Sequence, residues 1–152
     1  MNTTDLHKNL SSQLEQLASH VNDSLKGFEK AAGSVSPEAD TQRFLAMKTT
    51  REPLLDALNE RLQCIGENAE TSGSVKGATH RALISVKDLF TDSNSSEAIY
   101  EEAVRGETKL LEYIYEAFSD LETIDHATRE AIVELKGNVL RNISELKQHC
   151  SA

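Results

Sequence analysis

Four long segments of the chain place apolar side chains at spacings of three and four residues, which puts those side chains on one face of an α-helix. The segments span residues 4–32, 37–65, 96–118 and 125–149, and a shorter one spans residues 75–90. No segment alternates apolar and polar residues over the length of a strand. Helices with a single apolar face bury it against one another. The sequence therefore predicts one all-α domain over residues 1–152, built as a four-helix bundle.

The links between these segments predict how the helices run. Short links join the first long helix to the second and the third to the fourth, so each pair is expected to form an antiparallel hairpin. The link between the second and third long helices is long enough to run the length of the bundle, and we expect it to carry the short fifth helix. One long crossover of this kind is the ferritin-like topology, with the two middle helices parallel. Pro53 lies inside the second helix, where we expect a kink or a restart capped by Thr50.

The charge balance is acidic, with 16 Lys and Arg against 25 Asp and Glu and a formal net charge of −9. Nucleic acids and anionic membranes bind clustered basic side chains, so neither partner is expected. The N-terminal residues lack the basic and apolar regions of a signal peptide, and no apolar run approaches the roughly 20 residues of a membrane span. We therefore expect a cytoplasmic protein. Cys64 and Cys150 have no metal-ligand spacing and are expected to be free thiols.

A string within the long link is more distinctive than the apolar stripes. Its residues are Gly73, Ser74, Gly77, His80 and Arg81, and Arg105, Gly106 and Glu107 follow downstream. This combination resembles a bacterial ferritin-like four-helix-bundle family that is itself uncharacterised, a domain of unknown function. The resemblance covers residues 17–146 and implies a ferritin-like bundle with one long crossover.

The crossover motif has two interpretations. His80 and Arg81 either bind an anion or a partner carboxylate, with His80 titrating near neutral pH, or tether the crossover to the bundle. Gly73, Ser74 and Gly77 do not form a phosphate loop, because no strand precedes them and no Gly-Lys-Ser/Thr follows. Tight packing of the crossover accounts for these small residues.

Ferritin-like kinship raises the question of a di-iron site, which needs a Glu-x-x-His motif on each of two helices. No His in this sequence has a Glu three residues before it, and Ile143 follows Asn142 where relatives often carry His. No cofactor is therefore expected. A carboxylate-rich site, which favours Mn, Mg or Ca over iron, stays open as an alternative. Its candidate ligands are Asp23, Glu29, Glu102, Glu107 and His80.

Arg51 and Gly106 lie on apolar stripes without being apolar themselves. An inward-pointing Arg must pair with a carboxylate or with carbonyls, because an unpaired buried charge is strongly destabilising. Glu107 and Glu102 are the candidate partners, and Arg51, Gly106 and Glu107 would then form a polar pocket inside the bundle. In the alternative interpretation, Arg51 extends to the rim near Pro53 and Gly106 merely lets two helices approach closely.

The sequence contains no recognisable catalytic pattern, neither a nucleophile elbow nor an HExxH motif, so no catalytic residue and no enzyme activity are expected. The leading hypothesis is a non-catalytic bundle that acts through association with protein, including itself. Tyr100 and Leu111, off the main stripe, are the candidate self-association surface. The alternatives are an atypical ferritin-like metal-binding or redox protein, and a small-ligand binder with a cavity around Arg51 and Gly106.

Overall fold

The computed structural model describes the backbone of residues 3–36, 38–69 and 95–150 and the side chains of residues 9–36, 38–65 and 95–150. It has four long helices, α1 (Thr3–Ala32), α2 (Glu38–Ala69), α4 (Ser96–Ala117) and α5 (His126–Lys147). A 3₁₀ turn, η2 (Leu121–Thr123), connects α4 to α5. The described residues contain no strand, which confirms that this part of the chain is all-helical. The helix predicted over residues 75–90 lies outside the described residues.

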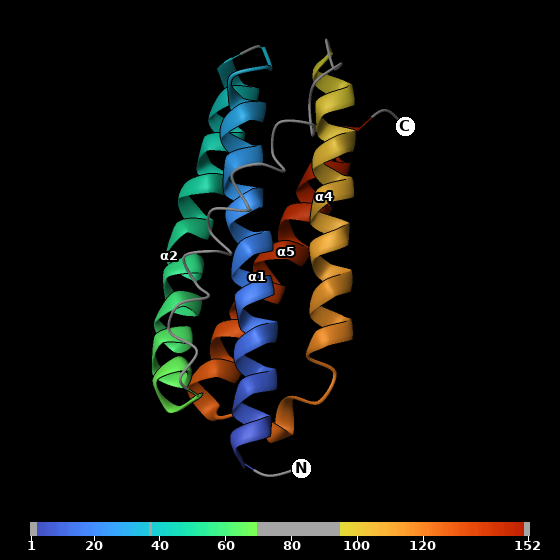
Figure 1. Cartoon of the computed structure of the whole chain (residues 1–152). Coiled ribbons are helices and arrows are strands. Elements are labelled where there is room, and N and C mark those ends of the chain that lie inside the picture. The colour runs from blue at the N-terminus through green and yellow to red at the C-terminus, as the bar shows by residue number, and fades with distance from the viewer. Residues whose placement is uncertain (1–2, 37, 70–94, 151–152) are drawn as a thin grey trace.

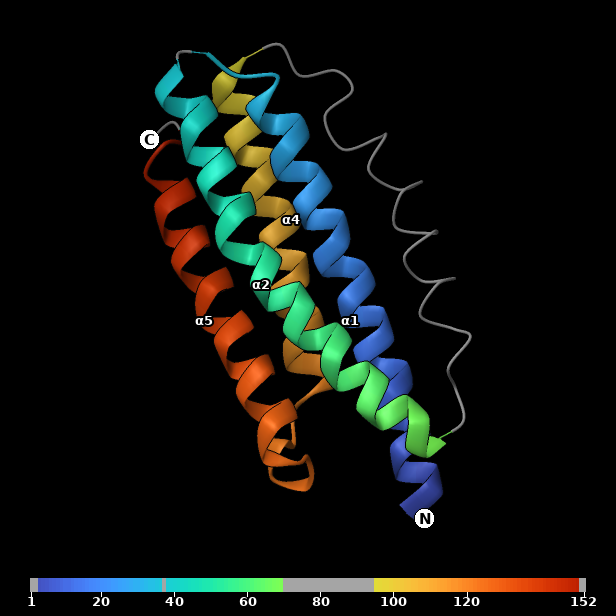
Figure 2. The same cartoon turned by 90° about the vertical axis from the view of Figure 1, so that its left-hand side faces the viewer.

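The four long helices lie side by side as a bundle (Figure 1). Each helix packs on two others: α1 and α5 both contact α2 and α4. The helices of each contacting pair run antiparallel, so the α1–α2 and α4–α5 links form the predicted hairpins. The last residues of α2 and the first of α4 lie at opposite ends of the bundle, and these two helices therefore run in the same direction (Figures 1 and 2).

The starts of α4 and α5 are capped by side chains immediately before them. Ser95 accepts a hydrogen bond from the backbone N–H of Ala98 at 3.1 Å, and Asp125 accepts one from Thr128 at 3.1 Å. Each bond satisfies an amide that the first turn of a helix leaves without a partner. Both helix starts are thus encoded by neighbouring residues.

The second long helix, α2, continues unbroken through Pro53. The predicted restart at Thr50 is wrong, because the Thr50 hydroxyl donates back to the Ala46 carbonyl at 2.8 Å instead of capping a new helix. The Thr49 hydroxyl likewise donates to the Leu45 carbonyl at 2.9 Å. Pro53 and Thr49 are both exposed, so the backbone bond that the proline cannot make is lost on the water-facing side of α2, where solvent replaces it.

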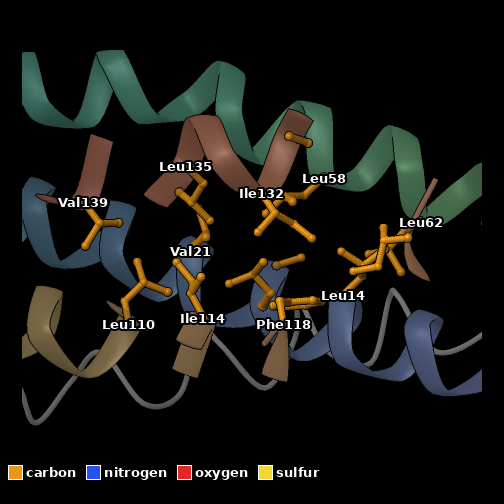
Figure 3. Close-up of a cluster of buried hydrophobic side chains, with 14 of the residues drawn as sticks. Leu14, Val21, Leu58, Leu62, Leu110, Ile114, Phe118, Ile132, Leu135 and Val139 are labelled. Carbon is orange, nitrogen blue, oxygen red and sulfur yellow. The ribbon is translucent and has the colours of Figure 1, made fainter. Parts of the chain in front are cut away.

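Two apolar clusters fill the bundle, and each takes side chains from all four helices. The larger cluster includes Leu14, Leu58, Ile114 and Leu135 (Figure 3). The smaller cluster includes Phe28, Phe44, Ile99 and Leu146. Burial of apolar surface stabilises such clusters by roughly 25 cal/mol per Å². In sequence, the boundary between the two clusters falls near the middle of α2 and α4, in the last third of α1 and in the last turn of α5.

Tyr100 belongs to the smaller cluster and is only 2% exposed. Its ring lies 5.0 Å from the Phe44 ring. Its hydroxyl donates to Asp40 at 2.6 Å and accepts from Arg43 at 2.7 Å. Leu111 packs against the larger cluster. The prediction that Tyr100 and Leu111 form a self-association surface is therefore wrong, because a buried, fully bonded phenol presents nothing to a second chain.

Two further expectations concern the cysteines and the membrane. Cys64 is exposed and Cys150 is half-buried, and both are free, as predicted. Among the helices that the structure describes, none is both long enough and apolar enough to cross a membrane.

Candidate functional site

A layer of polar side chains lies inside the bundle, between the two apolar clusters on α1, α2 and α4 and within the larger cluster on α5. Each helix contributes one residue: Ser24 from α1, Arg51 from α2, Glu107 from α4 and Asn138 from α5. Arg51 is the centre of the layer, and its side chain is 0% exposed. We refer to these four residues as the polar layer.

Every N–H group of the Arg51 guanidinium is hydrogen-bonded. Nη1 and Nη2 donate to the two carboxylate oxygens of Glu107 at 2.5 and 2.6 Å. Nε and Nη2 donate to Oδ1 of Asn138 at 2.9 and 2.7 Å, and Nη1 donates to Oγ of Ser24 at 3.1 Å. These bonds use all five donors that a guanidinium has. The guanidinium also lies over the Phe28 ring, 5.1 Å from its centroid, in a cation–π contact.

The geometry decides between the two interpretations of Arg51. Its side chain points into the bundle rather than toward the rim, so the alternative of an extended, solvent-reaching Arg51 is wrong. Its partner is Glu107, which is 2% exposed, rather than Glu102. Two parallel bonds between a guanidinium and a carboxylate are the strongest form of this pair, and each buried charge depends on the other for compensation.

A pocket of about 230 Å³ opens between α1 and α4 beside the polar layer, and we call it the α1/α4 pocket. Ser24 and Glu107 belong both to the polar layer and to the wall of this pocket. The other lining residues are apolar side chains and one glycine on the inside, and an exposed glycine with charged or titratable side chains toward solvent. The inner ones are Gly27, Phe28, Ala103 and Leu110, and the outer ones are Gly106, His20, Asp23, Glu102 and Lys109.

His20 is a titratable group in the wall of the pocket. Its ring packs against Tyr113 with centroids 4.8 Å apart. Burial lowers the pKa of His20, and the neighbouring Asp23 carboxylate opposes this shift without reversing it. Because the ordinary pKa of His is already near 6.5, the lowered pKa favours the neutral imidazole at pH 7.

The candidate metal ligands are divided among three places. Asp23, Glu102 and Glu107 line the α1/α4 pocket. Glu29 is on the α1 surface, where its carboxylate lies 3.3 Å from Nζ of Lys48. His80 lies outside the described residues, as does the rest of the crossover motif, Gly73, Ser74, Gly77 and Arg81. Within the described ranges, no three His, Cys, Asp or Glu side chains are grouped so that they could hold a metal ion.

Gly106 lies on α4 in the wall of the α1/α4 pocket, next to Glu107. A Cβ atom built on Gly106 would have no atom of another described side chain or helix within 4 Å. The interpretation that Gly106 lets two helices approach closely is therefore wrong for the four described helices. The missing side chain instead leaves open space in the pocket.

Sequence reasoning missed Ser24 and Asn138. Both lie one helical turn from apolar stripe positions: Ser24 is four residues before Phe28, and Asn138 is three residues after Leu135. The available signal was that a polar residue interrupts the buried face of every long helix, near the middle of α2, α4 and α5 and in the last third of α1. Finding the site from this signal requires the relative axial position of all four helices, which only their packing supplies.

Comparison with known proteins places the chain in a family without an assigned activity. Residues 9–120 match the family model described as a domain of unknown function (DUF2383). The match takes in α1 from residue 9, α2 and α4, and with them Ser24, Arg51 and Glu107. No curated protein matches the chain. Because the family model covers well over half of the sequence, the chain belongs to the DUF2383 family.

Proposed function

We propose that this protein is a non-catalytic, ferritin-like helical bundle that acts through protein association, and that its first partner is a second copy of the same chain. The observation that carries the proposal is an exposed apolar stripe on the outer face of α5. We take the protein to be cytoplasmic, an expectation that fits its acidic composition and two unpaired cysteines.

Two features support the ferritin-like relationship. The parallel run of α2 and α4 is the arrangement that a single long crossover produces. The polar layer lies inside the bundle, between side chains of all four helices, which is where bundle proteins of this type build metal sites. Here a guanidinium occupies that centre and takes both oxygens of Glu107. We therefore infer that the bundle architecture serves association rather than metal chemistry.

The outer face of α5 carries a second apolar stripe, opposite the buried one. Val133 and Leu140 are 47% and 42% exposed, seven residues apart and therefore on the same face. Gly137 lies between them, and Nη1 of Arg141 lies 3.3 Å from the position that a Cβ on Gly137 would take. On the neighbouring helix α4, Tyr115 is 49% exposed, and Nζ of Lys136 lies 4.9 Å from its ring centroid.

Charge along α5 favours a second copy as the occupant of this stripe. Glu134 lies beside the stripe before Gly137 and Arg141 lies beside it after Gly137, and the remaining charges of α5 are mixed in both halves of the helix. In a two-fold symmetric pair, the same patch faces itself, so an antiparallel α5–α5 contact centred near Gly137 would bring acidic residues of one copy opposite basic residues of the other. Glu134 and Arg141 are therefore a complementary pair across such a contact.

The test is the molar mass in solution, measured by size-exclusion chromatography with light scattering. We expect twice the chain mass for the wild type, and one chain mass for V133S/L140S with an unchanged circular dichroism spectrum. A wild type that stays monomeric at high concentration would refute the proposal.

A charge exchange provides the matched control. E134R alone and R141E alone place like charges opposite each other and should each weaken the dimer, whereas E134R/R141E restores opposite charges and should restore the dimer. Failure of the double variant to recover would show that the two helices do not pair antiparallel.

The alternative of an atypical metal-binding or redox protein has one observation in its favour: Asp23, Glu102 and Glu107 line the same pocket. Against it, both Glu107 oxygens are bonded to Arg51. Metal analysis of protein purified without chelator, and then exposed separately to Fe²⁺ and Mn²⁺, distinguishes this alternative from the association proposal.

A further inference from the structure

We propose that a second pocket, between α2 and α5, binds a small neutral primary amide. The two helices lie side by side (Figure 2), and the pocket opens between them with a volume of about 350 Å³. This volume falls within the roughly 300–1,000 Å³ of small-molecule sites. We call it the α2/α5 pocket. It is on the side of α5 that faces α2, away from Val133 and Leu140, so this inference is independent of the proposed association.

The α2/α5 pocket is lined by a buried amide without a partner. Asn142 of α5 is 7% exposed, and its Nδ2 atom forms no hydrogen bond with any described residue. One turn earlier on the same helix, Asn138 accepts two hydrogen bonds from Arg51. A buried polar group without a partner is strongly disfavoured, and most buried polar groups are paired. We infer that the partner of the Asn142 amide is a molecule that occupies the pocket.

The charged groups in the wall of the pocket, Arg43 and Glu145, already have partners. Nε of Arg43 lies 3.4 Å from a carboxylate oxygen of Glu145. Nη1 of Arg43 donates to Asp40 at 2.9 Å and to the Tyr100 hydroxyl at 2.7 Å. An anionic ligand would compete with two carboxylates for Arg43, and a cationic ligand would compete with Arg43 for Glu145. A neutral ligand leaves these contacts intact and is therefore favoured.

The uncharged polar groups select the functional group of the ligand. A primary amide carries a carbonyl acceptor and an NH₂ donor, the same two groups as the side chain of Asn142. Rotation about the last torsion of Asn142 exchanges Nδ2 and Oδ1, and a ligand with both groups pairs with either orientation. Across the pocket on α2, the Thr50 hydroxyl donates to the Ala46 carbonyl at 2.8 Å, so the Thr50 oxygen still accepts a bond from the ligand NH₂.

The remaining wall suits a short apolar body on the amide. Met47 of α2 lines the pocket and is 4% exposed. Ala39 and Ala46 are small residues of the same helix that also line the pocket. Methionine sulfur makes favourable contacts with aromatic rings. An amide carried on one aromatic ring therefore matches both the polar and the apolar groups of the pocket.

Titration of the ¹⁵N-labelled full chain, followed by NMR, tests this proposal with three probes of similar shape: benzamide, sodium benzoate and acetophenone. We expect saturable shifts of the Asn142 side-chain NH₂ signals with benzamide. Acetophenone, which lacks the NH₂ donor, should bind roughly tenfold more weakly, and benzoate should not bind. If millimolar benzamide causes no saturable shift, water is the partner of Asn142 and the proposal is wrong. Benzoate binding as tight as that of benzamide would also overturn it.

Two leucine variants locate the site. N142L removes the amide at similar volume and should weaken benzamide binding by roughly tenfold or more. N22L is the matched control, because Nδ2 of Asn22 is likewise buried without a partner in the described structure, but Asn22 belongs to α1 and does not line the pocket. N22L should bind benzamide as the wild type does, and an equal loss in N22L would refute the assigned site.

A third variant keeps the proposal testable if N142L folds poorly. Ala46 is exposed and lines the pocket from α2, so A46F fills the space without removing the Asn142 amide. A46F should also weaken benzamide binding by roughly tenfold or more. Unchanged benzamide binding by A46F would show that the ligand does not occupy the α2/α5 pocket.

Discussion

Replacing Arg51 by methionine tests the central interaction of the fold. Methionine has a similar length and no charge, so the R51M variant keeps most of the buried volume while it removes the guanidinium. Glu107 is 2% exposed and receives two bonds from Arg51, and Asn138 Oδ1 receives two more. The substitution leaves a buried carboxylate without compensation and an amide oxygen without donors.

The expected loss follows from that geometry. Removing one partner of a buried, hydrogen-bonded ion pair costs about 3–5 kcal/mol, mainly because the remaining charge stays buried. For a chain of this length, each kcal/mol lowers the melting temperature by roughly 2–4 °C. R51M should therefore melt roughly 6–20 °C below the wild type. Removing both charges in R51M/E107L should recover most of the loss, because apolar replacements of a whole buried pair are often neutral or stabilising.

Urea denaturation at neutral pH, followed by far-UV circular dichroism, measures the free energy of unfolding for the wild type and both variants. K48M is the matched control, because it removes one partner of the exposed Lys48–Glu29 pair and should cost less than about 1 kcal/mol. A free energy of unfolding for R51M within about 1 kcal/mol of the wild type would refute the reasoning. So would a double variant that is no more stable than R51M alone.

Two further predictions concern side chains at the ends of the bundle. D125A should lower the free energy of unfolding by about 1 kcal/mol, since Asp125 caps α5 through Thr128 and lies 3.2 Å from Arg61. Burial alone would raise the pKa of Asp125, but hydrogen bonds from Thr128 and the charge of Arg61 outweigh burial and lower the pKa below its ordinary 3.8. The stability that the Asp125 carboxylate contributes is therefore present above that pH, and it is lost in urea titrations at more acidic pH. If the free energies of unfolding of D125A and the wild type differ as much in strong acid as at neutral pH, loss of the charged Asp125 cap does not explain the lower stability of D125A. Y100F should cost about 1.5–3 kcal/mol, because the Tyr100 hydroxyl bonds to the charged groups of Asp40 and Arg43, and calorimetric melting that shows no difference would contradict these bonds.

Much of the secondary structure follows from the sequence alone. The apolar stripes predicted four long helices, and the observed α1, α4 and α5 each begin or end within three residues of the expected positions. These features are local: helix periodicity repeats every 3.6 residues, and the caps at Ser95 and Asp125 involve residues three positions apart. The parallel run of α2 and α4 also followed from the lengths of the links. The restart expected at Thr50 is the local feature that was misjudged, because the effect of Pro53 depends on which side of α2 faces water.

The sequence also indicated that Arg51 is out of place on an apolar stripe and that Glu107 was a candidate partner. It could not show that Ser24 and Asn138 complete the polar layer, that Tyr100 is buried, or that Gly106 borders an open pocket. Periodicity specifies which face of a helix is buried, but it does not specify how far one helix slides along another. Hydrogen bonds between helices depend on that axial position to within a fraction of a turn. The tertiary packing alone therefore decided which polar atoms meet at the centre of the bundle and where space is left beside them.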